Sequence, residues 1–515
     1  MHLSRRVRIF LWVVLCVFAG IGVTVGTLIY RFQPIARNYV ISALRERYHS
    51  DVNLGDLRIS LFPSVHATGE NLELHFGNRP DLPPLVRVRR FTLDASFAGF
   101  FRNPKRIGHL KLEGTEIHTP PRSGSHSTAA ANSSGTAVRI PFVLEEVIAD
   151  GTRLETMPSD PSKQPLIFHI RELALHSVGI GEAMTFHATL DNPKPPGLIH
   201  SDGKFGPWQA DEPGSTPVSG KYTFRDADLG IFHGIGGTLS SDGQYTGQLA
   251  RIEVQGTTET PNLTLSTGQH PMHLHTDFQA TVDGTNGNTV LHPVKARLGD
   301  SDFEVSGSID RSALEEHKTI LLDATAQGAH LEDFLRLSVK SPRPPMTGRI
   351  SFTTKVKLPP GKTDVVDRIQ LAGSFGLNGV RFASADVQGK IAGLSHRAQG
   401  HPQAEGSDVT ADFRGRFFLR DGMLTLPDLD FRVPGADVSL AGKYAVRSGD
   451  LSFQGTARLD ATVSEMTTGI KRILLKPIDP LFRRDGAGTV LPIEIGGTRG
   501  SPSFHLDIGK VLRRK

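Results

Sequence analysis

The pattern of apolar and polar positions begins with one long uncharged run. Residues 9–30, IFLWVVLCVFAGIGVTVGTLIY, contain no charged side chain. A helix of this length rises about 33 Å, enough to cross a hydrocarbon core of about 30 Å. Three arginines precede the run, and Trp12 and Tyr30 lie near its ends, as aromatic residues at membrane interfaces often do. The run therefore predicts a transmembrane helix over residues 9–30.

A cleaved signal peptide is the alternative for the same run, because Val17 and Ala19 can serve as small residues before a cleavage site. The run continues for eleven residues past Ala19, longer than a signal sequence needs, so we favour an uncleaved anchor. The anchoring side chains are then Leu11, Trp12, Val13, Val14, Leu15, Val17, Phe18, Leu28, Ile29 and Tyr30.

Beyond residue 51 the apolar residues recur at every second position. Residues 272–282 and 438–446 are clear examples, and Asp-Gly pairs such as Asp283-Gly284 and Asp421-Gly422 separate such runs. A period of two indicates half-buried antiparallel strands with one apolar and one wet face. The sequence predicts a mainly β fold, an antiparallel sheet with a few short helices.

Helical spacing is confined to short segments. Apolar positions at residues 34–44 predict a helix after the anchor, and two more are predicted around 330–337 and at 462–475, where Pro477 stops the helix. Two short later helices cannot cover dozens of strands. Either two sheets face each other, or one long sheet curls and leaves its apolar face along a groove. From the residue pattern alone we favour the facing sheets, since open sheets beyond about ten strands usually split.

A loose unit of Gly, a polar residue and an aromatic residue recurs without a fixed period, for example at Gly203-Lys204-Phe205 and Gly442-Lys443-Tyr444. It predicts strands that bend at glycine and pack an aromatic side chain beside the bend.

Composition shifts divide the chain further. Residues 119–138 are rich in Ser, Ala and Gly and predict a flexible loop. The expected regions are 31–118, 139–345 and 346–509, followed by a basic tail at 510–515. That tail can contact anionic lipid, but we favour a solvated terminus.

Charge and cysteine content exclude several classes of protein. The chain has 58 Lys and Arg against 53 Asp and Glu, a balance too even for a dedicated nucleic-acid binder. Its one cysteine, Cys16, excludes a disulfide framework, a cysteine-ligated zinc site and a dithiol redox centre.

Catalytic motifs are absent from the sequence. It contains no Gly-x-Ser-x-Gly and no His-Glu-x-x-His, and Gly361-Lys362-Thr363 lacks the earlier glycine of a phosphate loop, so we interpret it as a turn. His273, His275 and Asp277 share one face of a predicted strand, which suits either a divalent ion or a solvated surface. We favour the solvated surface, because open strand faces rarely supply the supporting groups a ligating histidine needs. We therefore expect no enzyme, no metal and no cofactor.

Three stretches together resemble the AsmA family of bacterial envelope proteins. The N-terminal stretch includes LGDLRISLFPSVHATGENLEL at 54–74, PLVRVRRFTLDASF at 84–97 and IGHLKLEGTEIHTP at 107–120. The C-terminal stretch includes VPGADVSLAGKYAVRSGDLSFQGTARLDA at 433–461 and LLKPIDPLFRRDGAGTVLPIEIGGTRGSPSFHLDI at 474–508, and residues 218–265 are also similar. These motifs are structural rather than catalytic.

The resemblance implies a single inner-membrane helix, with residues 1–8 in the cytoplasm and the bulk of the chain in the periplasm. It implies kinship with TamB and the chorein-type bridge-like lipid transfer proteins, whose shared feature is an elongated, curled β-sheet with an apolar groove. It also reverses the preference for facing sheets. Members of the family are associated with phospholipid movement to the outer membrane and with outer-membrane integrity.

The expected function is therefore an inner-membrane-anchored β-groove protein that supports phospholipid transfer or outer-membrane biogenesis. Its expected partners are phospholipids or other acyl-chain lipids and the bacterial inner membrane, without nucleic acid. The alternative is a periplasmic scaffold or assembly factor that pairs its strand edges with outer-membrane or envelope proteins. The side chains expected to line the groove are Phe91, Leu93, Phe97, Leu274, Phe278, Phe303, Val305, Phe417, Leu440, Tyr444 and Phe453.

Overall fold

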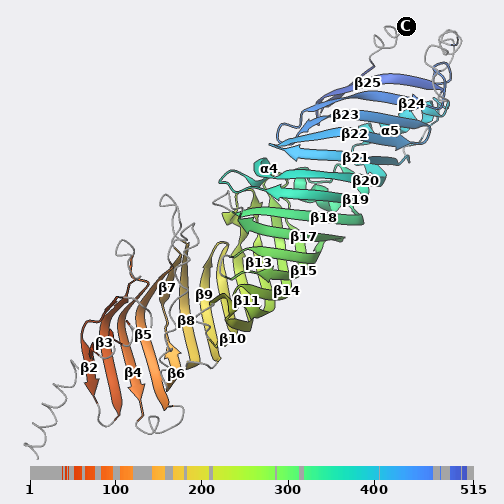
Figure 1. Ribbon diagram of the computed structural model, residues 1–515. Helices are drawn as coiled ribbons and strands as arrows, with labels where there is room; N and C mark the ends of the chain where they lie inside the picture. Colours follow the sequence, from red (N-terminus) through yellow and green to blue (C-terminus); the bar gives the residue numbers. More distant parts are fainter. Residues whose placement is uncertain are drawn as a thin grey trace, which may run out of the picture. The chain divides into compact units, whose positions relative to one another are not determined.

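The structure is a computed structural model of the chain (Figure 1). It describes residues 37–38, 41–42, 45, 51–60, 64–75, 83–96, 105–119, 142–156, 166–178, 183–207, 213–284, 287–311, 318–404, 406, 408–467, 476, 488–499 and 501–506. The predicted anchor at 9–30, the tail at 510–515 and all but the first residue of the predicted loop at 119–138 lie outside this range. Within the described residues, none of the helices has the length and apolar character needed to cross a bilayer.

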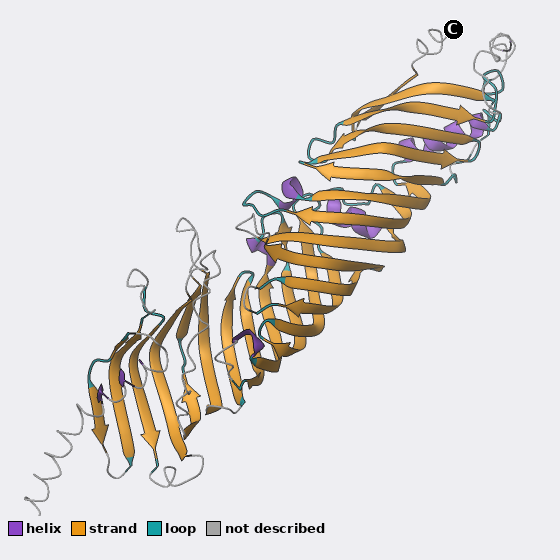
Figure 2. Cartoon of the chain, in the orientation of Figure 1, coloured by secondary structure: helices purple, strands orange, loops and turns teal. Residues whose placement is uncertain are grey.

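The described chain is mainly β, as the alternation of apolar and polar residues predicts (Figure 2). It divides into two compact units. Unit 1 comprises Met1–Phe224 and Thr246–Leu249, and unit 2 comprises Arg225–Tyr245 and Ala250–Lys515.

The strands of unit 1 are β1 to β10, and β11 and β13 contribute residues to both units. Their bounds are β1 Val52–Asn53, β2 Leu57–Ser60, β3 Val65–Leu74, β4 Val86–Ala95, β5 Lys105–Thr119, β6 Phe142–Ile148, β7 Thr152–Thr156, β8 Leu166–Val178, β9 Met184–Pro193, β10 Pro196–Phe205, β11 Pro217–Asp228 and β13 Thr238–Gln248. A short 3-10 turn, η1, spans Pro213–Ser215.

One part of unit 1 departs from the predicted antiparallel sheet. Strands β6 and β7 follow each other along β5, and both run parallel to it. Both then pair with β8 in the antiparallel sense. The expectation of a purely antiparallel sheet is wrong here. A parallel neighbour needs a crossover of a dozen residues or more, which a hairpin turn cannot supply, and residues 120–141 between β5 and β6 are long enough to allow it.

In unit 2, strands β14 to β26 pair antiparallel in sequence order, each with the next. They therefore form one sheet. The bounds are β12 Ile235–Gly236, β14 Arg251–Leu265, β15 Met272–Val282, β16 Thr289–Leu298, β17 Ser301–Arg311, β18 Lys318–His330, β19 Met346–Leu358, β20 Gln370–Phe382, β21 Ala411–Arg420, β22 Met423–Val433, β23 Ala436–Ala445, β24 Leu451–Leu459, β25 Thr489–Thr498 and β26 Ser501–Leu506.

Helices are few, and the predictions for them have mixed outcomes. The helix predicted around 330–337 is confirmed as α3, Leu331–Ser338. The described part of the helix predicted at 462–475, residues 462–467, is a turn with a hydrogen bond from Met466 N to Thr462 O of 3.2 Å, so the prediction is wrong there, and 468–475 lie outside the described range. Of residues 34–44, the four described ones, 37–38 and 41–42, are helical.

Four named helical segments were not predicted. They are the 3-10 turns η1 and η2, the latter at Leu229–Ile231, the single turn α4, Val365–Arg368, and α5, Ala385–Ala398.

The glycine–aromatic pattern corresponds to close packing across strands. Gly442 lies opposite Phe453, and Gly69 lies opposite Phe91. A Cβ atom added to Gly442 would overlap the Phe453 ring and the Ser452 carbonyl, and one added to Gly69 would overlap the Phe91 ring. The aromatic ring of the neighbouring strand therefore lies over the bare glycine backbone, whereas the sequence pattern concerns an aromatic residue two positions further along the same strand, such as Tyr444 after Gly442.

Replacing Gly442 with Ala tests this packing. We expect Gly442→Ala to lower the free energy of unfolding by about 1–3 kcal/mol, because the added methyl overpacks a tight contact. The matched control is Gly376→Ala in β20, where the nearest atom would be 4.0 Å from the new Cβ. We expect the control to be neutral or slightly stabilising. Denaturant unfolding of both variants measures the difference, and equal effects would contradict the packing explanation.

Candidate functional site

The register of unit 2 gathers the predicted lining residues on one face of the sheet. Residues directly opposite each other in an antiparallel pair point to the same side. Phe278 lies opposite Gly256, Phe303 opposite Ala296, and Val305 opposite both Val294 and Ala324. Continued across β14–β26, this register defines what we call the apolar face. Its predicted members are Leu274, Phe278, Phe303, Val305, Phe417, Leu440, Tyr444 and Phe453.

Unit 1 has an equivalent arrangement at its first strands. Phe91 and Leu93 of β4 share one face and lie opposite Leu112 and Leu110 of β5. Phe97, the third predicted residue of this region, lies outside the described range.

The opposite face of unit 2 carries paired charges. Arg416 Nε lies 2.7 Å from Asp428 Oδ2, and Arg414 Nε lies 3.1 Å from Asp430 Oδ2. These side chains are about half exposed, so each pair adds at most about 1 kcal/mol to stability. Their consequence is that the two faces of the sheet differ strongly in polarity.

Burial along each strand divides the apolar face into two zones. At one end of the strands, residues such as Val380, Val433 and Leu459 are almost fully buried, at 0%, 2% and 3% exposure. We call this the covered zone. At the other end, large apolar side chains remain half-buried, and we call this the open zone. Its residues include Leu371, Phe417, Leu419, Leu424, Tyr444, Leu451 and Phe453.

Two helices account for the covered zone (Figure 2). Leu331 and Leu335 of α3 and Ile391 and Leu394 of α5 pack in the same cluster as the buried strand residues. Leu440, a predicted lining residue, also belongs to this cluster and is 9% exposed. The structure therefore places Leu440 within the packed core of unit 2.

Helix α3 lies directly on the apolar face. The ring of Phe334 is 6.0 Å from that of Phe303 and 5.5 Å from that of Phe352, both in edge-to-face geometry. Phe303 is thus half-buried against protein, and in the open zone the ring of Phe417 lies 6.1 Å from that of Phe375.

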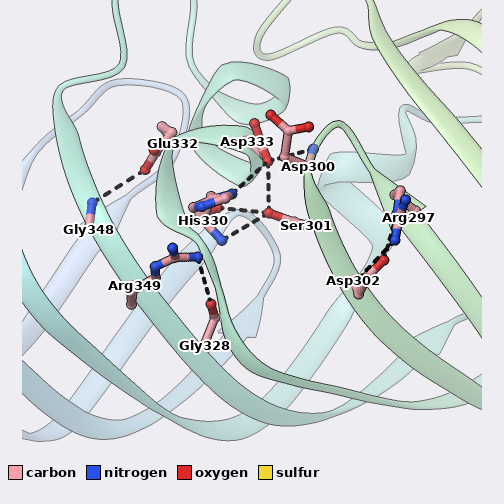
Figure 3. A network of polar contacts seen from close by, with 10 residues as sticks. All are labelled: Arg297, Asp300, Ser301, Asp302, Gly328, His330, Glu332, Asp333, Gly348 and Arg349. Atoms are coloured by element: carbon pink, nitrogen blue, oxygen red, sulfur yellow. Dashed lines mark hydrogen bonds and ion pairs between the residues drawn. The ribbon is translucent and has the colours of Figure 1, made fainter.

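A polar network fixes the start of α3 (Figure 3). Asp333 is 4% exposed, and its Oδ2 accepts hydrogen bonds from Ser301 Oγ at 2.8 Å and from Asp300 N at 3.1 Å. Ser301 Oγ accepts in turn from His330 N at 2.9 Å, and Glu332 Oε2 accepts from Gly348 N at 3.3 Å. Carboxylates in the first turn also interact favourably with the helix dipole. The network therefore ties α3 to the β16–β17 turn and to β19.

Removing the Asp333 carboxylate should release this tie. We expect Asp333→Ala to lower the free energy of unfolding of unit 2 by about 1–3 kcal/mol, because the buried Ser301 hydroxyl and the partly buried Asp300 N–H lose a charged acceptor. Asp300→Ala, at an exposed neighbouring position, is the control and should change stability by less than about 0.5 kcal/mol. Denaturant unfolding measures both, and an unchanged stability in Asp333→Ala would contradict the anchoring role.

Helix α5 is the element of the site that sequence reasoning missed. Ser384 Oγ caps it by accepting from Val387 N at 3.4 Å, and Ser395 Oγ donates to Pro434 O at 2.7 Å. The available signal was this serine followed by apolar residues at 387, 391, 394 and 398. Two interior glycines weakened it, since glycine disfavours helices.

The histidine cluster singled out in the sequence forms an ion-pair network on the exposed polar face. Glu259 accepts from His273 Nε2 at 2.7 Å and from His275 Nδ1 at 2.6 Å, and His275 Nε2 lies 3.5 Å from Asp277. Within the described residues, no group of histidine, cysteine and carboxylate side chains has an arrangement that could hold a metal ion. The cluster is thus a set of cross-strand pairs between β14 and β15.

The pKa values of His275 and Glu259 in this cluster shift in opposite directions. The hydrogen bond to Glu259 raises the pKa of His275 above its ordinary value of 6.5. For Glu259, burial raises the pKa, but the hydrogen bonds from both histidines outweigh it, so the pKa lies below its ordinary value of 4.5. Stability from Glu259 is present above that value and is lost as pH falls. Stability from His275 is present below pH 6.5 and is lost as pH rises through its folded pKa.

Titration of His275 by NMR checks these directions. We expect a pKa above 6.5 in the native protein and a lower one in Glu259→Gln, because the neutral amide no longer stabilises the imidazolium. A titration unchanged by Glu259→Gln would contradict the pairing.

Comparison with known proteins gives no match, either to a protein-family model, to a curated protein or to a solved structure.

Proposed function

We propose that the open zone of the apolar face holds the acyl chains of phospholipids or other lipids. In this proposal the protein is anchored in the bacterial inner membrane by residues 9–30, with its bulk in the periplasm. It supports phospholipid transfer or outer-membrane biogenesis without catalysing a reaction.

The observation that carries the proposal is the half-burial of large apolar side chains along the open zone. Because β14–β26 form a single sheet, no facing sheet within this set of strands covers these side chains. The two helices α3 and α5 pack over the covered zone. A soluble protein rarely exposes a continuous apolar surface of this kind without a ligand or partner for it.

The dimensions and energetics suit an acyl chain. Neighbouring strands are about 4.8 Å apart, so the five strands β20–β24 that carry the named open-zone residues extend roughly 19 Å across the strand direction. A leaflet of the hydrocarbon core is about 15 Å thick, so the zone is long enough for the acyl chains of one lipid. Burial of each CH₂ group gains about 0.8 kcal/mol, which offsets removal of the chain from a bilayer.

Adjacent phenylalanines in β21 provide a matched test. Phe417 lies in the open zone opposite Gly373, whereas Phe418 points to the polar face and is 47% exposed. We expect Phe417→Asp to reduce co-purifying lipid several-fold, because a carboxylate against acyl chains is costly. Phe418→Asp, with the same change one residue along, should leave lipid unchanged. Mass spectrometry of lipids extracted from the full-length protein under mild conditions measures both.

Folding of each variant is checked by circular dichroism and thermal unfolding. Equal lipid in a folded Phe417→Asp variant, or no lipid in the unaltered protein, would count against lipid binding and favour a scaffold for envelope proteins. That alternative depends instead on strand edges such as β26, whose described partner is β25.

A further inference from the structure

A set of contacts joins loops that the strand register would keep apart. The loop between β19 and β20, residues 359–369, contains α4 and is called the clasp here. Asp364 Oδ2 of the clasp accepts from Ser266 Oγ at 2.9 Å, and Val365 N donates to His233 O at 2.8 Å. Ser266 N also donates to Gly234 O at 2.9 Å. The clasp therefore meets the η2–β12 turn and the β14–β15 turn at one junction.

The register shows that this junction crosses the sheet. Leu358, at the start of the clasp, pairs with Ile320, which pairs with Ile309. Ile309 pairs with Thr289, which pairs with Val282 at the end of β15. The clasp thus lies at the edge of the sheet where β15 ends, at Val282. Ser266 lies at the opposite edge, just before β15 begins at Met272.

An eleven-residue strand is about 36 Å long, so these parts could not meet in a flat sheet. The sheet is coiled enough for opposite strand ends to touch.

The closure lies over the apolar face. Helix α3 packs on that face through Phe334, and its Leu337 carbonyl lies so close to Gly268 that an added Cβ would overlap it. Gly268 belongs to the same β14–β15 turn as Ser266. The clasp, this turn and α3 together therefore bridge the apolar face over β15–β19. Figure 1 shows α4 at the ends of β19 and β20, beside the earlier strands of unit 2.

An exposed ion pair holds the clasp from its other side. Arg447, in the β23–β24 turn, donates from Nε to Asp367 Oδ1 and from Nη2 to Asp367 Oδ2, both at 2.6 Å. Its Nη2 also lies 3.6 Å from Asp364 Oδ2. The hydrogen bond from Arg447 lowers the pKa of Asp367. The two side chains of the main pair are 54% and 42% exposed, so salt screens their attraction and the pair can open at modest cost.

We propose that the clasp is a gate that divides the apolar face into two stretches and opens to let an acyl chain pass between them. This rests on the proposed lipid function and assigns a regulatory element to the same face. The described contacts that hold the gate shut are polar contacts at turns, one exposed ion pair, and the two buried side chains of Val365 and Val366. The covered zone, in contrast, is a packed hydrophobic core.

A reversible lock tests the gate. Ser266→Cys and Asp364→Cys are combined in full-length protein with Cys16→Ser, so that a disulfide or a short bis-thiol reagent can join the two turns. A photoreactive phenylalanine replaces either Val254 of β14, which lies opposite Ala280 on the apolar face, or Phe417 of β21, on opposite sides of the bridge, and lipid cross-linking is measured in cells. We expect the locked protein to lose lipid labelling several-fold at one of the two positions only. Reduction of the same disulfide-locked protein should restore labelling.

The outcomes separate the two proposals. Labelling unaffected by the lock at both positions, or reduced equally at both, would overturn the gate while leaving lipid binding in place. No labelling at either position, locked or reduced, would overturn lipid binding as well.

Weakening the ion pair between Arg447 and Asp367 should have the opposite effect to the lock and open the gate. Arg447→Gln should increase labelling at the position that the lock silences, and high salt should have the same effect on the unaltered protein. Arg432→Gln is the matched control, because Arg432 also forms an exposed pair, with Asp437, at the far end of β22. Equal labelling in Arg447→Gln and in the control would argue that the clasp is a static brace.

Discussion

The whole of unit 2 depends on one constraint, the preservation of side-chain parity from strand to strand. A slip of one residue at any pairing would turn every later apolar side chain toward water. Several pairs contain register shifts, for example between Leu291 and Val294, yet Val294 still lies opposite Val305 on the apolar face. The bulges therefore bend the strands without exchanging their faces. The paired charges on the other face reinforce the same register, because a slip would separate each arginine from its aspartate.

The face of the sheet to which each side chain points was also the feature that the sequence could predict. Alternation is a local property, so the strands and the common face of residues such as Phe278 and Tyr444 could be predicted without coordinates. The parallel placement of β6 and β7 could not, because it depends on a distant pairing with β5. Helix α5 was missed because its glycines lower local helix propensity, and packing against the β22–β23 region compensates for them.

The distinction between covered and open zones is likewise a tertiary property. Tyr444 and Leu440 follow the same alternation on one strand and differ only in whether α5 and its neighbours cover them. Nor does the sequence pattern indicate the junction of Ser266 with Asp364, since 98 residues separate them and neither belongs to a recognisable motif. A coiled sheet thus acquires contacts that depend on its curvature, and a change in curvature would be felt first at such contacts.

The parallel pieces β6 and β7 have a consequence for how the chain reaches its fold. In unit 2, strands β15 to β26 each pair with their predecessor, so assembly can proceed in the order of synthesis, although residues 383–410 separate β20 from β21 and residues 460–488 separate β24 from β25. In unit 1, β5 must wait while the chain continues through residues 120–141 before its next neighbour arrives, and β20 and β24 of unit 2 wait for their next neighbours in the same way. During that interval β5 presents an unpaired edge, the kind of edge to which other chains can add. The strands that precede these long intervening segments, β5, β20 and β24, are thus the points at which the growing chain is most exposed to aggregation during biogenesis.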